Sequence, residues 1–115
     1  MPRSLSVAAI QMISSASLEG NLETARRLVG EAAKAGAKVI TLPEYFCLMG
    51  LNDTDKVKVR EAFGSGPIQS AMQELAHQHQ IYLFAGTIPL EASDQHKVLN
   101  TTLVFNPQGI CTARY

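Results

Sequence analysis

Cysteine is scarce in this sequence. Only Cys47 and Cys111 occur among 115 residues, and no two cysteines have the C-x-x-C spacing. That absence excludes a zinc knuckle and a thioredoxin-like redox site. Two cysteines far apart in the sequence give no evidence for a disulfide, so we expect two free thiols in a reducing compartment.

The sequence also has no excess of charge and no long apolar run. Ten Lys and Arg residues balance ten Asp and Glu residues, which leaves no electrostatic footprint for a nucleic acid or an anionic membrane. The longest clean apolar stretches, such as Val7 to Ile10 and Ile81 to Ala85, are too short to cross a bilayer. The N-terminal run is also too short for a signal sequence. We therefore expect a cytoplasmic protein with neither nucleic-acid nor membrane partners.

What the sequence does contain is typical of one globular domain. Apolar residues make up 46% of the chain and charged residues 17%, which is enough apolar material for a hydrophobic core. Neither an internal repeat nor a low-complexity segment interrupts it. We expect a single domain over residues 4–115.

The first half predicts a strand, a helix and a second strand. Ser4 to Met12 has the short apolar run of a strand. Apolar residues then recur at helical spacing, which predicts a helix from Leu22 to Ala35 with Asn21 as N-cap and Gly36 as C-cap. Ala37 to Leu42, rich in β-branched residues, predicts the second strand, and a unit of this length favours a parallel pair.

The middle of the chain predicts loops and two helices. Tyr45 to Asp53 is typical of a loop, and Asp55 to Phe63 predicts a short helix. The breaker Gly64 to Pro67 then leads into a third helix, since proline suits the first helical turn. One face of that helix carries Ile68, Met72, Leu75 and Ala76.

The last third predicts three strands. These are Ile81 to Thr87, then, after a loop from Pro89 to Lys97, Val98 to Phe105, and finally Ile110 to Tyr115. The segment Asn106 to Gly109 strongly favours a tight turn, because proline suits the second turn position and glycine the last. The last two strands should therefore pair antiparallel. The whole order, β-α-β-α-α-β-β-β, indicates an α/β layered domain. Because the sequence stops at Tyr115 inside a predicted strand, we expect a truncated domain with an exposed sheet edge.

Glu44 is the candidate catalytic residue. It follows the second predicted strand directly, and reactive groups gather at the carboxyl ends of strands in open parallel sheets. Apolar neighbours from Leu42 to Phe46 should partly desolvate the carboxylate, which would suit it to general-base work. The alternative is a structural glutamate that caps helix donors or pairs with an arginine.

Other chemically active side chains give weaker signals. Free cysteines mostly behave as small hydrophobes, so we expect packing roles for Cys47, in a loop, and Cys111, in a strand. His77 and His79, two apart on a helix, point to different faces and cannot both bind one metal ion. His96 stands alone. Three lysines in polar contexts should be solvated: Lys56, Lys58 and Lys97.

Four segments resemble the nitrilase superfamily of carbon–nitrogen hydrolases. Glu31 to Glu44 looks like the first family signature, with an alanine-rich helix, a Gly-Ala turn, an aliphatic strand and Leu-Pro-Glu. Val7 to Met12 is similar to the family's first strand with its glutamine. Asn100 to Gly109 is similar to its asparagine-bearing strand and turn, and Ala113 to Tyr115 fits the approach to the second signature. The resemblance covers essentially the whole chain in order.

The resemblance implies that residues 4–115 are the N-terminal portion of a single carbon–nitrogen hydrolase domain, an α-β-β-α sandwich that is incomplete here. It also implies hydrolysis of small amides by a Glu–Lys–Cys triad. The glutamate is the general base, the cysteine thiolate forms a thioester, and the lysine stabilises the tetrahedral intermediate. Only Glu44 has a counterpart in this chain. The lysine would come just after Tyr115 and the cysteine further on. The family resemblance also implies ω-amide or deaminated-glutathione substrates, a homodimer in the full-length form, and no cofactor or metal.

Two alternatives stay open. The chain could be a catalytically inactive fragment or an association-only module, because two triad members are absent. A flavodoxin-like binding domain fits the early β-α-β pattern, but it leaves the terminal hairpin unexplained. For the isolated chain we expect little turnover, and aggregation through unpaired strand edges.

Overall fold

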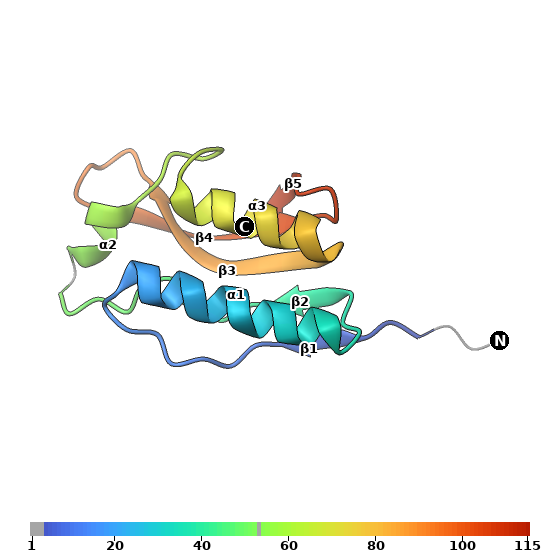
Figure 1. The fold of residues 1–115 in the computed structure, drawn as a ribbon. Coiled ribbons are helices and arrows are strands. Elements are labelled where there is room, and N and C mark those ends of the chain that lie inside the picture. Colours follow the sequence, from blue (N-terminus) through green and yellow to red (C-terminus); the bar gives the residue numbers. More distant parts are fainter. Residues whose placement is uncertain (1–3, 53) are drawn as a thin grey trace.

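A computed structural model describes residues 4–52 and 54–115. Its centre is a five-stranded sheet in which the strands follow chain order, β1-β2-β3-β4-β5. The first three strands run parallel, and the last two pairings are antiparallel (Figure 1). The strand bounds are β1 Val7–Ala9, β2 Val39–Thr41, β3 Tyr82–Glu91, β4 Val98–Phe105 and β5 Cys111–Arg114.

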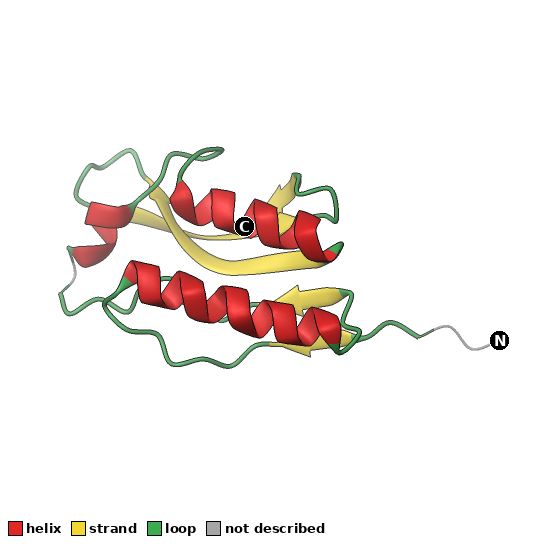
Figure 2. Cartoon of the chain, viewed as in Figure 1, coloured by secondary structure: helices red, strands yellow, loops and turns green. Residues whose placement is uncertain are grey.

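Two long helices cover one face of this sheet and contact each other (Figure 2). They are α1, Leu18–Lys34, and α3, Pro67–His79. The short helix α2, Asp55–Val59, lies at the end of the molecule toward which the parallel strands point. The connections at that end therefore gather where open α/β sheets hold their reactive groups.

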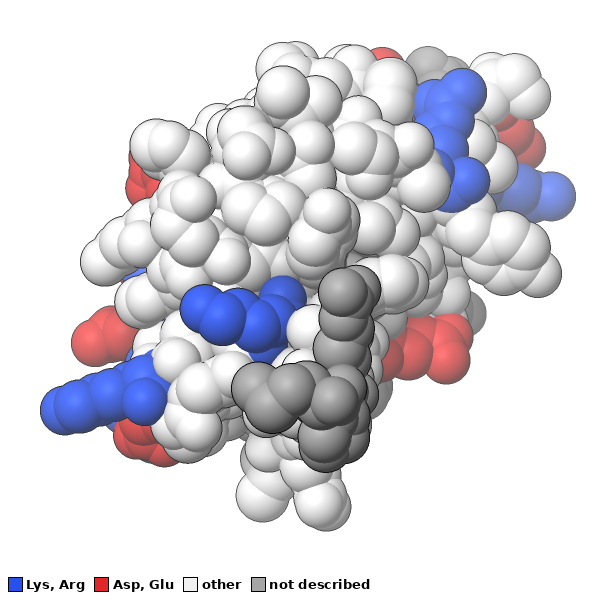
Figure 3. Space-filling view, turned by 90° about the vertical axis from the view of Figure 1, so that its right-hand side faces the viewer, with Lys and Arg blue, Asp and Glu red and all other residues white. Residues whose placement is uncertain are grey.

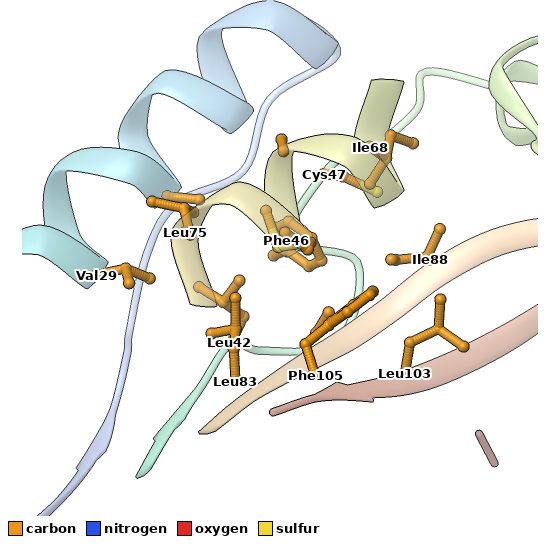
Figure 4. Close-up of a cluster of buried hydrophobic side chains, with 14 of the residues drawn as sticks. Val29, Leu42, Phe46, Cys47, Ile68, Leu75, Leu83, Ile88, Leu103 and Phe105 are labelled. Atoms are coloured by element: carbon orange, nitrogen blue, oxygen red, sulfur yellow. The ribbon is translucent and has the colours of Figure 1, made fainter. Parts of the chain in front are cut away.

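The hydrophobic core fills the space between the sheet and these two helices (Figure 4). Val29 and Leu75 reach it from the helices, while Leu83 and Phe105 reach it from the sheet. The face of α3 predicted from its helical spacing is fully buried, as expected for an amphipathic helix. The core thus holds the three parallel strands and both helices in one fixed arrangement.

The other face of the sheet carries no helix among the described residues. On this open face Val7 pairs with Val39, and Val39 pairs with Tyr82. Val7 and Tyr82 are 64% and 47% exposed, and Phe84 further along β3 is 38% exposed. An apolar face of this kind is what one half of an α-β-β-α sandwich presents to its second sheet.

The element order agrees with the prediction, but several ends differ. Helix α1 begins four residues earlier than expected, because Ser17 rather than Asn21 is its N-cap: the Ser17 hydroxyl accepts a hydrogen bond from the Gly20 N–H at 3.1 Å. Asn21 lies inside the helix and is buried, and its side-chain amide donates to the Ser15 and Cys47 carbonyls. The predicted C-cap is off by one residue: Ala35 caps the helix, and Gly36 follows it with φ 103°.

The strands differ from their predicted lengths in both directions. β1 and β2 keep only three residues each. β3 continues to Glu91, so the predicted loop from Pro89 is wrong at its start; a bulge between Ala85 and Ile88 lets the strand bend and keep pairing with β4. α2 ends at Val59 rather than Phe63. Asp53, the last residue of the predicted loop, lies outside the described residues.

Several predictions are confirmed without change. α3 begins at Pro67, and β4 has the predicted bounds. The Gly109 N–H donates to the Asn106 carbonyl at 2.8 Å and closes the predicted turn. β5 returns antiparallel to β4.

Neither the surface charges nor the helices suggest a membrane-spanning segment in the described residues. On the face in Figure 3, a few Lys, Arg, Asp and Glu side chains are scattered among neutral residues. Within residues 4–52 and 54–115, the helices are too short or too polar to cross a membrane.

Candidate active site

Glu44 lies on a tight turn directly after β2. The turn is tied to the bulged part of β3 at two points. The Leu42 N–H donates to the Phe84 carbonyl at 2.9 Å, and the Tyr45 N–H donates to the Thr87 hydroxyl at 3.2 Å. Tyr45 has φ 58°, an uncommon conformation for a non-glycine residue, and such backbone strain often accompanies a functional site.

The close approach of this turn to β3 requires a glycine. A Cβ atom on Gly86 would lie 2.5 Å from the Leu42 carbonyl oxygen, which is far inside van der Waals contact. Gly86 lies within the bulge of β3. The bulge and its glycine therefore set how near the Glu44 turn comes to the sheet.

The Glu44 side chain is exposed, so the predicted partial desolvation is wrong. Its apolar neighbours do not cover it, because Leu42 and Phe46 point into the core and are 2% and 0% exposed. One partner holds the carboxylate: the side-chain amide of Asn100 donates to Glu44 Oε1 at 3.0 Å. Asn100 lies on β4, 56 residues away in the sequence.

A lysine lies beside the same turn. Lys56 Nζ is 3.0 Å from the centroid of the Tyr45 ring, within cation–π distance. The expectation that Lys56 is solvated is therefore wrong, since its side chain is only partly exposed. Lys58 agrees with the expectation, being 73% exposed at 3.9 Å from Asp55, and Lys97 is exposed as well.

Cys47 lies three residues after Glu44 and is packed as a core residue. It is 1% exposed, and its Sγ is 3.8 Å from the Thr87 carbonyl oxygen. Burial raises the pKa of the Cys47 thiol to about 12, with a smaller contribution from the charge of Glu61. Because the thiolate is the nucleophilic form, a buried thiol of this kind is inert, which agrees with the predicted packing role. Cys47 and Cys111 are both free.

Glu61 is a buried carboxylate that was not among the residues predicted from the sequence. It is 6% exposed and accepts hydrogen bonds from the Ile68 N–H at 2.6 Å and the Gln69 N–H at 3.1 Å. The Gln69 side-chain amide adds a third at 3.0 Å. These are the free donors at the start of α3, so Glu61 is a structural cap. A glutamate shortly before a Gly-Pro helix start is the signal that could have revealed it.

The remaining candidates do not converge on a metal site. In the part of the chain that the structure describes, no group of three or more His, Cys, Asp or Glu side chains could hold a metal ion. His77 is exposed and His79 partly buried, against Gly30 of α1.

Beside Asn100, a groove continues along the sheet toward Arg114 and Tyr115. Arg114 itself stacks on the Phe63 ring, 4.3 Å from the ring centroid.

Comparison with known proteins gives one consistent family. A family model described as "Carbon-nitrogen hydrolase" matches residues 6–115. The chain is 34% identical over 109 residues to a deaminated glutathione amidase of Synechocystis, with 94% of the chain and 39% of the relative covered. It is also 34% identical over 115 residues to the omega-amidase NIT2 of Homo sapiens, with 97% and 39% covered.

A solved structure supports the fold. The Nit3 protein of Saccharomyces cerevisiae, a member of branch 10 of the nitrilase superfamily, superposes with a TM-score of 0.84 at 26% identity. That alignment covers 96% of this chain and 43% of Nit3. The fold prediction is therefore confirmed. The chain spans about two fifths of the length of the curated relatives it matches, as their 39% coverage states.

Proposed function

The chain belongs to the carbon-nitrogen hydrolase family, within the nitrilase superfamily, and we propose that it supplies Glu44 as the general base of an amidase. The substrates would be small amides of the kinds named for its relatives, an ω-amide or a deaminated glutathione. The Lys and Cys of the triad have no counterpart among these 115 residues, so a longer polypeptide or a second one would have to provide them.

One observation carries the proposal. Glu44 is a solvent-accessible carboxylate at the carboxyl end of a parallel strand, held by Asn100 on the open face of the sheet. That face is the side from which a second sheet of the sandwich would bring further residues. A base with this access can reach a nucleophile that approaches from outside the described core.

The reaction then follows ordinary thiol chemistry. Glu44 takes the proton of the cysteine thiol, and the thiolate attacks the amide carbon. The lysine stabilises the oxyanion of the tetrahedral intermediate. As the C–N bond breaks, the protonated Glu44 gives its proton to the leaving ammonia or amine, and a thioester remains. Glu44 next takes a proton from water, whose oxygen attacks the thioester. The C–S bond then breaks, Glu44 returns the proton to the cysteine sulfur, and the carboxylic acid leaves.

Cys47 is the competing nucleophile within the chain, and its burial argues against that role. A thiol with its pKa near 12 has almost no thiolate at neutral pH. It is also packed against the backbone of Thr87 rather than aimed at the Glu44 carboxylate. The proposal therefore predicts no Cys47-dependent turnover.

The test is an ammonia-release assay with ω-amides, run on the 115-residue chain and on the polypeptide encoded when the reading frame continues past Tyr115. We expect no turnover from the short chain and turnover from the longer one, lost in Glu44→Gln. Glu74→Gln, which changes an exposed glutamate on α3, is the matched control and should stay active.

Two outcomes would count against the proposal. Activity that survives Glu44→Gln would show that another group is the base. An immediate stop codon after Tyr115, together with no turnover in any assay, would favour the alternative of an inactive fragment or an association module.

A further inference from the structure

Asn100 is a polar residue of the sheet whose contact has no part in the fold. Its side-chain amide reaches across β3 from β4 and donates to Glu44 Oε1 at 3.0 Å. Both side chains are exposed, so the bond neither fills the core nor satisfies a buried group. A bond of this kind adds little stability, so the question is what it does to the carboxylate.

The sheet fixes where Asn100 points. Asn100 pairs with Pro89 of β3, and its neighbour Thr101 is buried on the helix side with its hydroxyl bonded to the Leu99 carbonyl at 3.1 Å. Because side chains alternate along a strand, a buried Thr101 places Asn100 on the open face. The carboxylate is thus held between two rigid supports, the turn after β2 and the strand β4.

The bond treats the two carboxylate oxygens differently. Oε1 accepts from Asn100, whereas no hydrogen bond from the described residues reaches Oε2. A glutamate side chain without such a partner would sample several rotamers. Restricting it to the one reactive rotamer would then cost conformational entropy. One oxygen is therefore held while the other stays available for a proton.

The chemical nature of the donor matters as much as its place. An asparagine amide is neutral, so it orients the carboxylate without neutralising its charge. An arginine or lysine at the same distance would favour the ionised form strongly and weaken its ability to take a proton. Of the described cationic side chains, none lies within 4.0 Å of the Glu44 carboxylate.

We propose that Asn100 is a positioning residue for Glu44: it anchors Oε1 so that Oε2 is the oxygen that takes the proton from the nucleophile. This inference rests on the proposed function, because it assigns a role within the same reaction. Asn100 acts through Glu44 and has no contact with the substrate in this role. The competing explanation is an ordinary surface hydrogen bond.

The kinetic test uses the longer, active polypeptide with three variants. Asn100→Ala removes the anchor and should lower kcat by about 10- to 100-fold with little change in KM, because a misplaced group loses its reactive geometry. Asn100→Asp places a second carboxylate beside Glu44. Like charges disfavour ionisation, so the acid limb of the pH–rate profile should move to higher pH. Thr102→Val, two residues along the same face, is the matched control and should behave as wild type.

A spectroscopic arm uses the same longer polypeptide. In NMR spectra of that polypeptide, the Asn100 side-chain amide protons should shift when acid protonates the Glu44 carboxylate. That shift should vanish in Glu44→Gln and persist in Thr102→Val. A structural bond without catalytic meaning would give this signature but leave the pH–rate profile of the Asn100 variants unchanged.

The outcomes separate the two proposals. If Glu44→Gln stays active, the proposed function fails and the role of Asn100 fails with it. If Glu44→Gln is inactive while Asn100→Ala and Asn100→Asp keep wild-type kcat and pH dependence, only the positioning role is overturned. Loss of kcat in Asn100→Ala together with the shifted acid limb in Asn100→Asp supports it.

Discussion

The side chain of Glu61 occupies the space in which a side chain at position 66 would begin. A Cβ atom on Gly66 would lie 2.6 Å from Glu61 Cγ, and closer still to other atoms of that side chain. Gly66 also has φ 134°, a backbone conformation that favours glycine. The buried cap of α3 and the glycine before it are thus one structural unit, and neither can change without the other.

Gly66→Ala should destabilise the chain more than Gly64→Ala does. Both glycines have positive φ, but a Cβ on Gly64 would meet no atom within 4 Å. Gly64→Ala should cost roughly 1–2 kcal/mol from the backbone conformation alone. Gly66→Ala should add roughly 1–3 kcal/mol for overpacking against the buried carboxylate. Chemical denaturation measures both, and equal losses would refute a tight Glu61–Gly66 contact.

Gly86→Ala should move the turn that carries Glu44. The new Cβ would lie 2.5 Å from the Leu42 carbonyl oxygen, and a backbone atom cannot swing away as a side-chain end can. We expect a loss of roughly 1–3 kcal/mol in the free energy of unfolding, and a larger fall in kcat of the longer enzyme than stability alone explains.

Gly30→Ala is the control for Gly86→Ala, because here the glycine-to-alanine change should raise the free energy of unfolding instead of lowering it. Gly30 lies inside α1, and its Cβ would meet His79 only at ordinary contact distances of 3.7 and 3.8 Å. Alanine in a helix interior is favoured over glycine by roughly 0.5–1 kcal/mol, so the chain should gain stability. A Gly86→Ala protein as stable as wild type would show that the turn is not held against β3.

Local patterns were enough for the order of elements and for the buried face of α3, but not for the ends of α1 and α2. The spacing of Ile68, Met72 and Leu75 predicted the buried face of α3, because apolar residues that recur at helical spacing mark the face that packs against the core. Strand ends were harder. β3 runs past Pro89 because the bulge and the partner strand support it, and neither is a local property of those residues.

The candidate site was predicted in position but not in environment. Leu-Pro-Glu after a strand located Glu44, yet the nearby apolar residues suggested burial that does not occur. Which way Leu42 and Phe46 point is decided by packing against α1 and α3, and that requires the tertiary structure. The contact with Asn100 spans 56 residues and could not be predicted from local pattern.

Lys56→Met should lower stability more than Lys58→Met. The two lysines lie on the same short helix, but only Lys56 contacts an aromatic ring, 3.0 Å from the Tyr45 centroid. Loss of a cation–π contact at a partly exposed site costs about 0.5–1 kcal/mol. Lys58 is 73% exposed near Asp55, and a surface pair of this kind is worth little. A double-mutant cycle of Lys56→Met with Tyr45→Leu isolates the contact; a coupling energy of zero would contradict it.

Cys47 should make stability fall at high pH. Its thiol has an ordinary pKa of 9.0 when unfolded and about 12 when folded, because burial disfavours the thiolate. Below pH 9 the Cys47 thiol keeps its proton in both the folded and the unfolded state, so its contribution to the free energy of unfolding is fully present. Between about 9 and 12 the unfolded chain releases a proton that the folded chain retains, so unfolding becomes easier as pH rises. The slope approaches about 1.4 kcal/mol per pH unit at most.

The measurement is the difference in free energy of unfolding between wild type and Cys47→Ala across that range. Other groups titrate there too, but they are common to both proteins and cancel. The gap between the two should shrink from pH 9 upward. Iodoacetamide gives an independent check, since Cys47 should react only on unfolding. Rapid alkylation of native Cys47 at pH 8 would show that the thiol is accessible and would reopen its candidacy as a nucleophile.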